Sequence, residues 1–308
     1  MQQSEFRLPA SDGVAVFVRS FLPDGAPRAI VQIAHGMAEH GARYARFAAA
    51  LAERGLGAYV ADHRGHGHTA ASPDELGHFA DHDGWRKVLD DQRLVLDEVK
   101  SRHAQVPVFL MGHSMGSFIV RDLLPQVARQ LAGLVVSATT HEPLPLVRAA
   151  RAIALVERTR LGRRGKSKVL RALTFDQYNR RVDHPRTEFD WLSRDPAEVD
   201  AYAADPLCGF MCSAQLYRDM FGGMLRAFGP DALRGVPKTL PVYILAGECD
   251  GLNNRLAGIR RFHQALESAA MSALTLRVYP GARHELLNET NRDEVTRDLV
   301  GWLEARLG

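Results

Sequence analysis

The sequence predicts an α/β fold in which helices cover both faces of a mainly parallel sheet. Short apolar runs of strand length alternate with longer segments whose apolar residues recur at helical spacing. This alternation breaks at residue 140, so we also expect an insertion in the fold. The chain has 308 residues, of which 46% are hydrophobic and 24% charged, and it is long enough for one large domain with an inserted segment.

The first 140 residues contain most of the expected sheet. Residues 5–22 predict a hairpin, because Ser11-Asp12-Gly13 is a turn signal and valines alternate with small or polar residues after it. Further strands are expected at 29–34, 57–61, 108–111 and 131–137. Helices are expected at 41–54, at 81–102 and directly after residue 114.

Residues 141–208 interrupt the pattern. They are rich in Arg and Pro and show no strand signal, so we predict a helical cap inserted after the sixth or seventh strand. The core is then made of 1–140 and 209–308. In its second part the pattern predicts a core helix at 209–228, strands at 240–246 and 274–279, and helices near 254–269 and 291–307.

The most informative stretch is 106–120. Its sequence Gly112-His113-Ser114-Met115-Gly116 has the form G-x-S-x-G, preceded by a buried strand and followed by apolar residues at helical spacing. Strand, sharp turn and helix together make a nucleophile elbow. The glycines permit a strained backbone and a close approach of strand and helix. We therefore interpret Ser114 as a catalytic nucleophile.

A serine hydroxyl needs a general base, and the base needs an orienting carboxylate. Ligands bind at the carboxyl ends of strands in open α/β sheets, and two strand ends follow Ser114. The second of them supplies His284, which we assign as the base. The first supplies Asp250 as the orienting acid, with Glu248 as the runner-up, and the order Ser, Asp, His is that of α/β-hydrolases.

A tetrahedral intermediate also needs two amide donors. One is the backbone amide of Met115, directly after the proposed nucleophile. The other is expected in the loop after the 29–34 strand, where His35-Gly36-Met37 follows, and we choose the amide of Met37. Because backbone groups do this work, the side-chain type at both positions matters little.

Six motifs in the chain occur together in one known family. They are His35-Gly36-Met37-Ala38-Glu39-His40, Asp62-His63-Arg64-Gly65-His66-Gly67, Gly112-His113-Ser114-Met115-Gly116, Tyr202-Ala-Ala-Asp205-Pro206-Leu207, Gly247-Glu-Cys-Asp250 and Gly281-Ala-Arg-His284-Glu285. In this order, and spanning residues 35–285, they resemble the monoacylglycerol lipase and lysophospholipase-like α/β-hydrolases. The resemblance implies a serine esterase with a cap over an acyl pocket and no metal or other cofactor.

Two positions depart from the family pattern, and two other features need an interpretation. Ser117 stands where a third glycine is common, and Gly251 stands where proline or a larger residue is common.

The histidine-rich loop 62–68 lacks a nearby cysteine partner, so we interpret it as a solvated or structural loop and not as a metal site. Cys249, next to Asp250, is expected to be a buried thiol.

The cap contains an unusually basic stretch. Between Arg148 and Arg171 there are nine basic residues and one acidic residue, Glu157. One interpretation is a lid helix over 144–156, apolar toward the pocket and charged toward water, followed by a mobile basic loop. Leu144 and Ile153 would then bind substrate. The other interpretation is peripheral contact of 148–171 with an anionic membrane or a phosphate headgroup.

Composition excludes several other classes. The net charge of +3 is too small to indicate nucleic acid binding, and three cysteines without a Cys-x-x-Cys pair suit a reducing compartment. The N-terminus lacks the basic and apolar regions of a signal peptide, and no apolar run reaches the roughly 18–20 residues of a membrane span. We therefore expect a cytoplasmic protein that is at most peripheral to a membrane.

Three functions remain open from the sequence. The first is hydrolysis of a single-chain lipid ester, either a monoacylglycerol or a lysophospholipid. The second is another serine-hydrolase activity on this fold, such as a small-ester carboxylesterase or an aminopeptidase, although the basic stretch is a poor match for a substrate ammonium. The third is a non-catalytic binding protein, which would be expected to have lost one member of the Ser114, Asp250 and His284 set.

Overall fold

The computed structural model describes residues 1–179 and 181–307, which are built around one eight-stranded sheet. The strand order is β1-β2-β4-β3-β5-β6-β7-β8, and only the β1–β2 and β2–β4 pairings are antiparallel. The strands are β1 (Gln2–Pro9), β2 (Ala15–Leu22), β3 (Ala29–Ala34), β4 (Leu56–Ala61), β5 (Val108–His113), β6 (Gly133–Ser137), β7 (Val242–Gly247) and β8 (Leu274–Tyr279). The predicted α/β fold with a mainly parallel sheet is thus confirmed.

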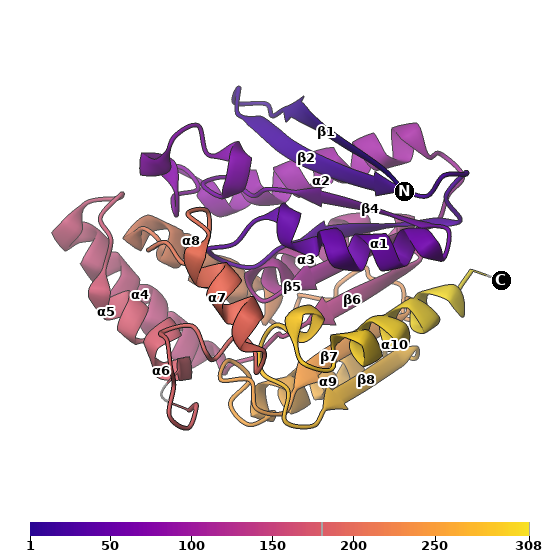
Figure 1. The fold of residues 1–308 in the computed structure, drawn as a ribbon. Coiled ribbons are helices and arrows are strands. Elements are labelled where there is room, and N and C mark those ends of the chain that lie inside the picture. The colour runs from indigo at the N-terminus through magenta and orange to yellow at the C-terminus, as the bar shows by residue number, and fades with distance from the viewer. Residues whose placement is uncertain (180, 308) are drawn as a thin grey trace.

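Helices cover both faces of this sheet. Apolar residues of α1 (Ala45–Glu53) and α10 (Arg292–Glu304) pack on one face, and Figure 1 shows both helices in front of the strands. Apolar residues of α2 (Gly84–Arg102), α3 (Met115–Val127), α8 (Ala214–Ala227) and α9 (Ala257–Ser268) join the larger cluster on the other face. The central strands β3 to β7 are buried along their whole length, as expected for parallel strands covered on both sides.

The segment between β6 and α8 contains further helices and no strand among its described residues. These helices are α4 (Leu144–Leu161), α5 (Lys168–Ala172), α6 (Phe175–Asn179) and α7 (Pro196–Ala204). In Figure 1 they gather at one end of the sheet, on the left of the view. None of the helices in the described part of the chain combines the length and apolar composition that a membrane crossing requires.

The junction of β5 and α3 depends on close backbone contact. A Cβ atom placed on Gly116 would lie 2.0 Å from the carbonyl oxygen of Ala34, at the end of β3. A Cβ atom on Gly112 would lie 2.5 Å from the carbonyl oxygen of Gly116. Backbone atoms cannot swing aside as a flexible side chain can, so only glycine allows α3 to begin this close to β3 and β5.

We expect Gly116→Ala to lower the free energy of unfolding by about 1–3 kcal/mol or more, because the added methyl group overpacks a rigid backbone contact. A matched control is Gly301→Ala in α10, where an added Cβ meets nothing within 4 Å. That change should stabilise the protein by about 0.5–1 kcal/mol, the usual gain from replacing a helical glycine. Urea unfolding measures the free energy of unfolding of both variants. A small effect at Gly116 would contradict the close-contact account.

Candidate active site

Ser114 sits on the sharp turn between β5 and α3, with a φ of 53° and a ψ of −119°. Its backbone N–H donates to the carbonyl of Ser137 at the end of β6, at 3.0 Å. The side chain is partly exposed, and its hydroxyl has no hydrogen-bond partner among the described residues. A positive φ at a residue with a side chain is a strained conformation, and strain of this kind is typical of functional sites.

His284 and Asp250 form a buried hydrogen-bonded pair. Both oxygens of the Asp250 carboxylate lie 3.0 Å from Nδ1 of His284, and the two residues are each 2% exposed. The Asp250 carboxylate is itself held by the backbone N–H of Leu252, at 2.9 Å. An acceptor at Nδ1 keeps the proton on that nitrogen, so the other nitrogen, Nε2, is free to accept a proton when the ring is neutral.

Aromatic rings place His284 beside the elbow. The ring of His113, which directly precedes Ser114, lies 5.0 Å from the His284 ring, and Trp191 lies 4.8 Å from it on another side. Burial alone would lower the pKa of His284, but the charge and hydrogen bond of Asp250, together with Glu285 and Glu39, raise it above its usual 6.5. Burial lowers the pKa of His113 to about 4, so that neighbour is neutral near pH 7.

The loop around Asp250 corrects one expectation. Cys249 is exposed and not buried, because the chain turns outward after β7 before Asp250 points back toward His284. Glu248 is also exposed, and its carboxylate accepts the N–H of Gly281 at 2.9 Å instead of approaching the histidine. Gly251 is explained by packing, since a Cβ there would lie 2.8 Å from the Cβ of Tyr178 in α6.

The loop after β3 carries the predicted second amide donor. Met37 is partly buried against the core, and its backbone N–H has no acceptor among the described residues. A Cβ on the preceding Gly36 would lie 3.3 Å from the Cβ of Ser114, so this loop passes directly beside the elbow. The N–H of Gly36 is held by Glu39, which also binds Arg43 at 2.8 Å.

Helix α7 and the residues that follow it anchor the same loop. The hydroxyl of Tyr202 donates to the carbonyl of Ala38 at 2.8 Å, and the N–H of Gly209 donates to the same carbonyl at 2.9 Å. His40 Nε2 pairs with Asp205 at 2.8 Å. Potential metal-binding atoms of His40, Asp205 and Cys208 lie within 4.8 Å of one another, but this hydrogen bond already explains the His40–Asp205 approach.

The histidine-rich loop 62–68 packs against the loop that follows β3. His63 and His66 are buried, whereas His68 is exposed. The backbone N–H of His63 donates to Nε2 of His35 at 3.0 Å, and Nε2 of His63 lies 3.0 Å from the His35 carbonyl oxygen. The structural interpretation of His63 and His66 therefore fits these contacts.

Comparison with known proteins places this chain in a family. Residues 25–291 match the family model described as serine aminopeptidase, S33. The chain belongs to this family. Monoacylglycerol lipase of Mycolicibacterium smegmatis is 28% identical over 99% of this chain and 98% of its own length, and human monoglyceride lipase is 29% identical over 96% and 89%. The resemblance drawn from the motifs is thus confirmed.

The fold agrees with this assignment. The crystal structure of a thermostable carboxyl esterase from Bacillus coagulans in complex with glycerol superimposes with a TM-score of 0.91, at 26% identity and with both chains fully covered. The chain is therefore a hydrolase of the α/β-hydrolase fold, as the sequence predicted.

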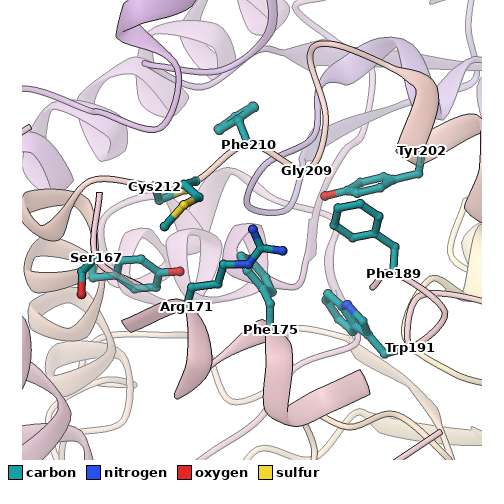
Figure 2. Close-up of a pocket in the computed structure, with 11 residues that line it drawn as sticks. Ser167, Arg171, Phe175, Phe189, Trp191, Tyr202, Gly209, Phe210 and Cys212 are labelled. Atoms are coloured by element: carbon teal, nitrogen blue, oxygen red, sulfur yellow. The ribbon is translucent and has the colours of Figure 1, made fainter. Parts of the chain in front are cut away.

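Two spaces lie close to the candidate site residues of this S33-family hydrolase. A cavity of about 380 Å³ lies under α4 and reaches Gly251 and Leu252, directly after Asp250. Its apolar lining includes Leu146, Ile153, Leu170, Phe221 and Met224. A second pocket, shown in Figure 2, lies beside Trp191 and has a free volume of only about 10 Å³. Aromatic rings of Phe175, Phe189 and Phe210 surround it, and the side chain of Arg171 extends among them.

The cap helix differs in part from its expected orientation. Ile153 lines the larger cavity, but Leu144 packs against the core outside that lining. Leu155 and Val156 are 44% and 64% exposed, so these two apolar residues of 144–156 do not face the cavity, which departs from the expected lid helix that is apolar toward the pocket. The reason is that α4 buries a narrow face of small residues, Val147 and Ala154, against α8.

Hydrogen bonds hold the basic loop after α4 in place at its C-terminal end. The ammonium group of Lys166 donates to the carbonyls of Leu76 and Met211, and the Ser167 hydroxyl accepts the N–H of Leu170 at the start of α5. Glu157, the acidic residue of this stretch, pairs with Arg160 at 2.7 Å. The expected mobile loop is therefore anchored at Lys166 and Ser167.

Asp250→Asn should lower the pKa of His284, because the neutral amide no longer stabilises the imidazolium. A group with a raised folded pKa stabilises the native state fully below about pH 6.5, and this contribution is lost as pH rises through the folded pKa. In the variant, the free energy of unfolding should lose this part of its pH dependence. NMR titration of the ring signal that disappears in His284→Gln measures the pKa. Glu248→Gln, at an exposed position, is the control and should leave the pKa of His284 unchanged. A larger effect of Glu248→Gln than of Asp250→Asn would show that Glu248 is the partner of His284.

Proposed function

We propose that this hydrolase cleaves carboxylic esters of single-chain lipids through an acyl-enzyme on Ser114. The observation that carries the proposal is the buried Asp250–His284 pair beside a strained serine at a helix N-terminus. This combination is what a serine nucleophile requires: a base that can take its proton and a carboxylate that orients the base. Its members lie in the chain order used by α/β-hydrolases.

In the proposed first step, the Ser114 oxygen attacks the ester carbonyl carbon while His284 Nε2 takes the hydroxyl proton. The carbonyl oxygen becomes an oxyanion, which the N–H groups of Met37 and Met115 stabilise, assisted by the positive end of the α3 dipole. The intermediate collapses when its bond to the leaving oxygen breaks and His284 gives its proton to that oxygen. The alcohol leaves, and the acyl group stays on Ser114.

In the second step, water takes the place of the alcohol. His284 removes a proton from a water molecule as the water oxygen attacks the acyl carbon. The same two amides hold the oxyanion. The bond between the acyl carbon and the Ser114 oxygen then breaks as His284 returns the proton to that oxygen, which releases Ser114 and a carboxylic acid. The bare Ser114 hydroxyl in the free protein fits this scheme, because catalytic hydrogen bonds often tighten only when substrate is bound.

The lipid assignment rests on the 380 Å³ cavity and on the names of the relatives. We propose 141–208 as a cap whose helix α4 closes this cavity, with Ile153 on the acyl chain. Apolar walls remove a hydrocarbon chain from water, and each buried methylene contributes about 0.8 kcal/mol. The monoacylglycerol lipases named above cover nearly the whole chain, which supports a substrate of the same class.

A small-ester carboxylesterase is the second candidate. The pocket beside Trp191, whose ring lies 4.8 Å from that of His284, is almost closed, and its free volume of about 10 Å³ holds no more than about one water molecule. Arg171 extends into this pocket, where it pairs with Asp176 and Glu188. If acyl groups had to occupy this pocket, short chains would be preferred over long ones.

Ser114→Ala is expected to lower kcat by at least about 10³-fold, the scale for loss of a triad member, with no loss of folding stability. Nitrophenyl ester hydrolysis measures the rate, and urea unfolding checks the fold. A fluorophosphonate should label the wild-type protein on Ser114 and should not label the variant. Near-normal turnover in the variant, or labelling of another residue, would refute the role of Ser114.

Catalytic efficiency should rise with acyl length beyond four carbons, several-fold for each added carbon until the cavity is full. Ile153→Trp fills part of the cavity and should shift the optimum to shorter chains. Val156→Trp is the matched control, because Val156 lies on the same helix, exposed and outside the cavity lining. A panel of nitrophenyl esters and monoacylglycerols measures both variants. Efficiency that falls from acetate onward would favour the small-ester candidate.

We also propose that 148–171 contacts anionic membranes, because the exposed Val156 and Val169 lie in the same stretch as exposed arginines. Reversing Arg163 and Arg164 to Glu should weaken binding to phosphatidylglycerol vesicles about tenfold or more, at roughly 1 kcal/mol per basic residue. High salt should have the same effect. Reversing the exposed Arg129 and Arg234 to Glu makes the same charge change outside 148–171. An equal loss of vesicle binding in this control would contradict a specific membrane-binding surface at 148–171.

A further inference from the structure

A separate cavity of about 290 Å³ lies between α3, the C-terminal end of α8 and α9. It shares no lining residue with the cavity under α4 or with the pocket beside Trp191. Most of its lining is apolar, including Leu124, Leu134, Phe228, Leu233, Phe262 and Leu266. The proposed ester hydrolysis makes no use of this space.

One charged side chain, Arg121, is present among the described residues of this lining. It is only 4% exposed. Its Nη1 donates to the carbonyl of Thr140 at 2.7 Å and to the hydroxyl of Thr139 at 3.1 Å, and its Nη2 donates to Nδ1 of His141 at 3.0 Å. The buried Nε has no partner among the described residues. Every acceptor that Arg121 contacts in the described chain is therefore neutral.

The charged groups next to the cavity do not neutralise Arg121. Burial lowers the pKa of His141 to about 3, with Arg121 and Arg261 acting in the same direction, so His141 is neutral. Glu142 is already occupied, because its carboxylate accepts from Arg261 at 2.8 Å and from the Thr140 hydroxyl at 2.7 Å. Among the described residues, no carboxylate is hydrogen-bonded to the Arg121 guanidinium.

Two aromatic rings stabilise the Arg121 guanidinium without neutralising it. The guanidinium carbon lies 4.5 Å from the Phe228 ring centroid and 3.8 Å from that of Phe262. Burial lowers the pKa of Arg121 to about 9, so the group still carries its charge near pH 7. A buried charge without an opposite charge is costly, and a carboxylate is the partner that best matches a guanidinium.

We propose that this cavity binds an amphiphile with one carboxylate head and a hydrocarbon tail, and that its occupancy changes turnover at Ser114. The head pairs with Arg121, and the tail lies along the apolar walls. The link to the elbow is short. The Thr139 hydroxyl accepts from Arg121 and lies 2.7 Å from the hydroxyl of Ser117, which in turn donates to the Ser114 carbonyl at 2.5 Å. Ser117 is the residue that departs from the family's third glycine.

Decanoate and 1-decanol are matched probes, because they share a tail and differ in the charge of the head. We expect titration calorimetry to show the wild-type protein binding decanoate at least tenfold more tightly than decanol. Arg121→Met should weaken decanoate binding at least tenfold and leave decanol binding unchanged. Ala265→Phe keeps the guanidinium, fills the cavity, and should weaken both ligands. Arg129→Met removes an exposed arginine near the end of α3 and should change neither.

Steady-state hydrolysis of nitrophenyl butyrate tests the coupling. Decanoate should change kcat at saturating substrate at least twofold in the wild type and should not change it in Arg121→Met. Competition by decanoate at the catalytic site alters only KM, and it persists in the variant. Equal decanoate affinity with and without Arg121, or decanoate bound no better than decanol, would overturn the proposal. Specific binding with an unchanged kcat would overturn the coupling to Ser114.

Discussion

The contact on which the site depends is the approach of the Gly116 backbone to the carbonyl groups of Ala34 and His35. A Cβ at this position would lie 2.0 Å from the first oxygen and 2.6 Å from the second. Because nothing larger than hydrogen fits, the start of α3 lies against the end of β3. This single contact brings the Met115 amide, the strained Ser114 and the loop containing Met37 to the same edge of the sheet. The proposed oxyanion hole is a consequence of that backbone geometry.

The loop after β3 keeps its shape through buried ionic contacts and through contacts with the proposed cap. Glu39 holds the Gly36 amide and shares Arg43 with Glu285, the residue directly after His284. Arg43 pairs with Glu285 through two nitrogens, a geometry that fixes orientation as well as distance. Removing one partner of a buried pair typically costs about 3–5 kcal/mol. The network thus links the loop of Met37 to the loop of His284, and Tyr202 joins the loop of Met37 to the proposed cap.

The sequence predicted the features that depend on local pattern. Strand and helix positions follow from apolar periodicity, and the elbow follows from two glycines around Ser114. The pairing of Asp250 with His284 follows from the rule that strand ends meet at one edge. Features set by tertiary packing were not predictable. The outward turn at Cys249, the narrow buried face of α4 and the uncompensated Arg121 depend on neighbours distant in sequence. The motif Tyr202–Leu207 was a usable signal for the loop anchor, but only the contact to Ala38 explains it.

The central claim is that the Met37 and Met115 amides stabilise the oxyanion of a tetrahedral intermediate that is bonded to the Ser114 oxygen. A crystal structure of the protein after reaction with an alkyl fluorophosphonate tests this most directly, because the adduct mimics the tetrahedral intermediate. The account predicts phosphorus bonded to the Ser114 oxygen and one phosphonyl oxygen about 2.7–3.1 Å from both amide nitrogens. His284 Nε2 should face the remaining alkoxy oxygen. An adduct on another residue, or a phosphonyl oxygen directed away from both amides, would contradict the account.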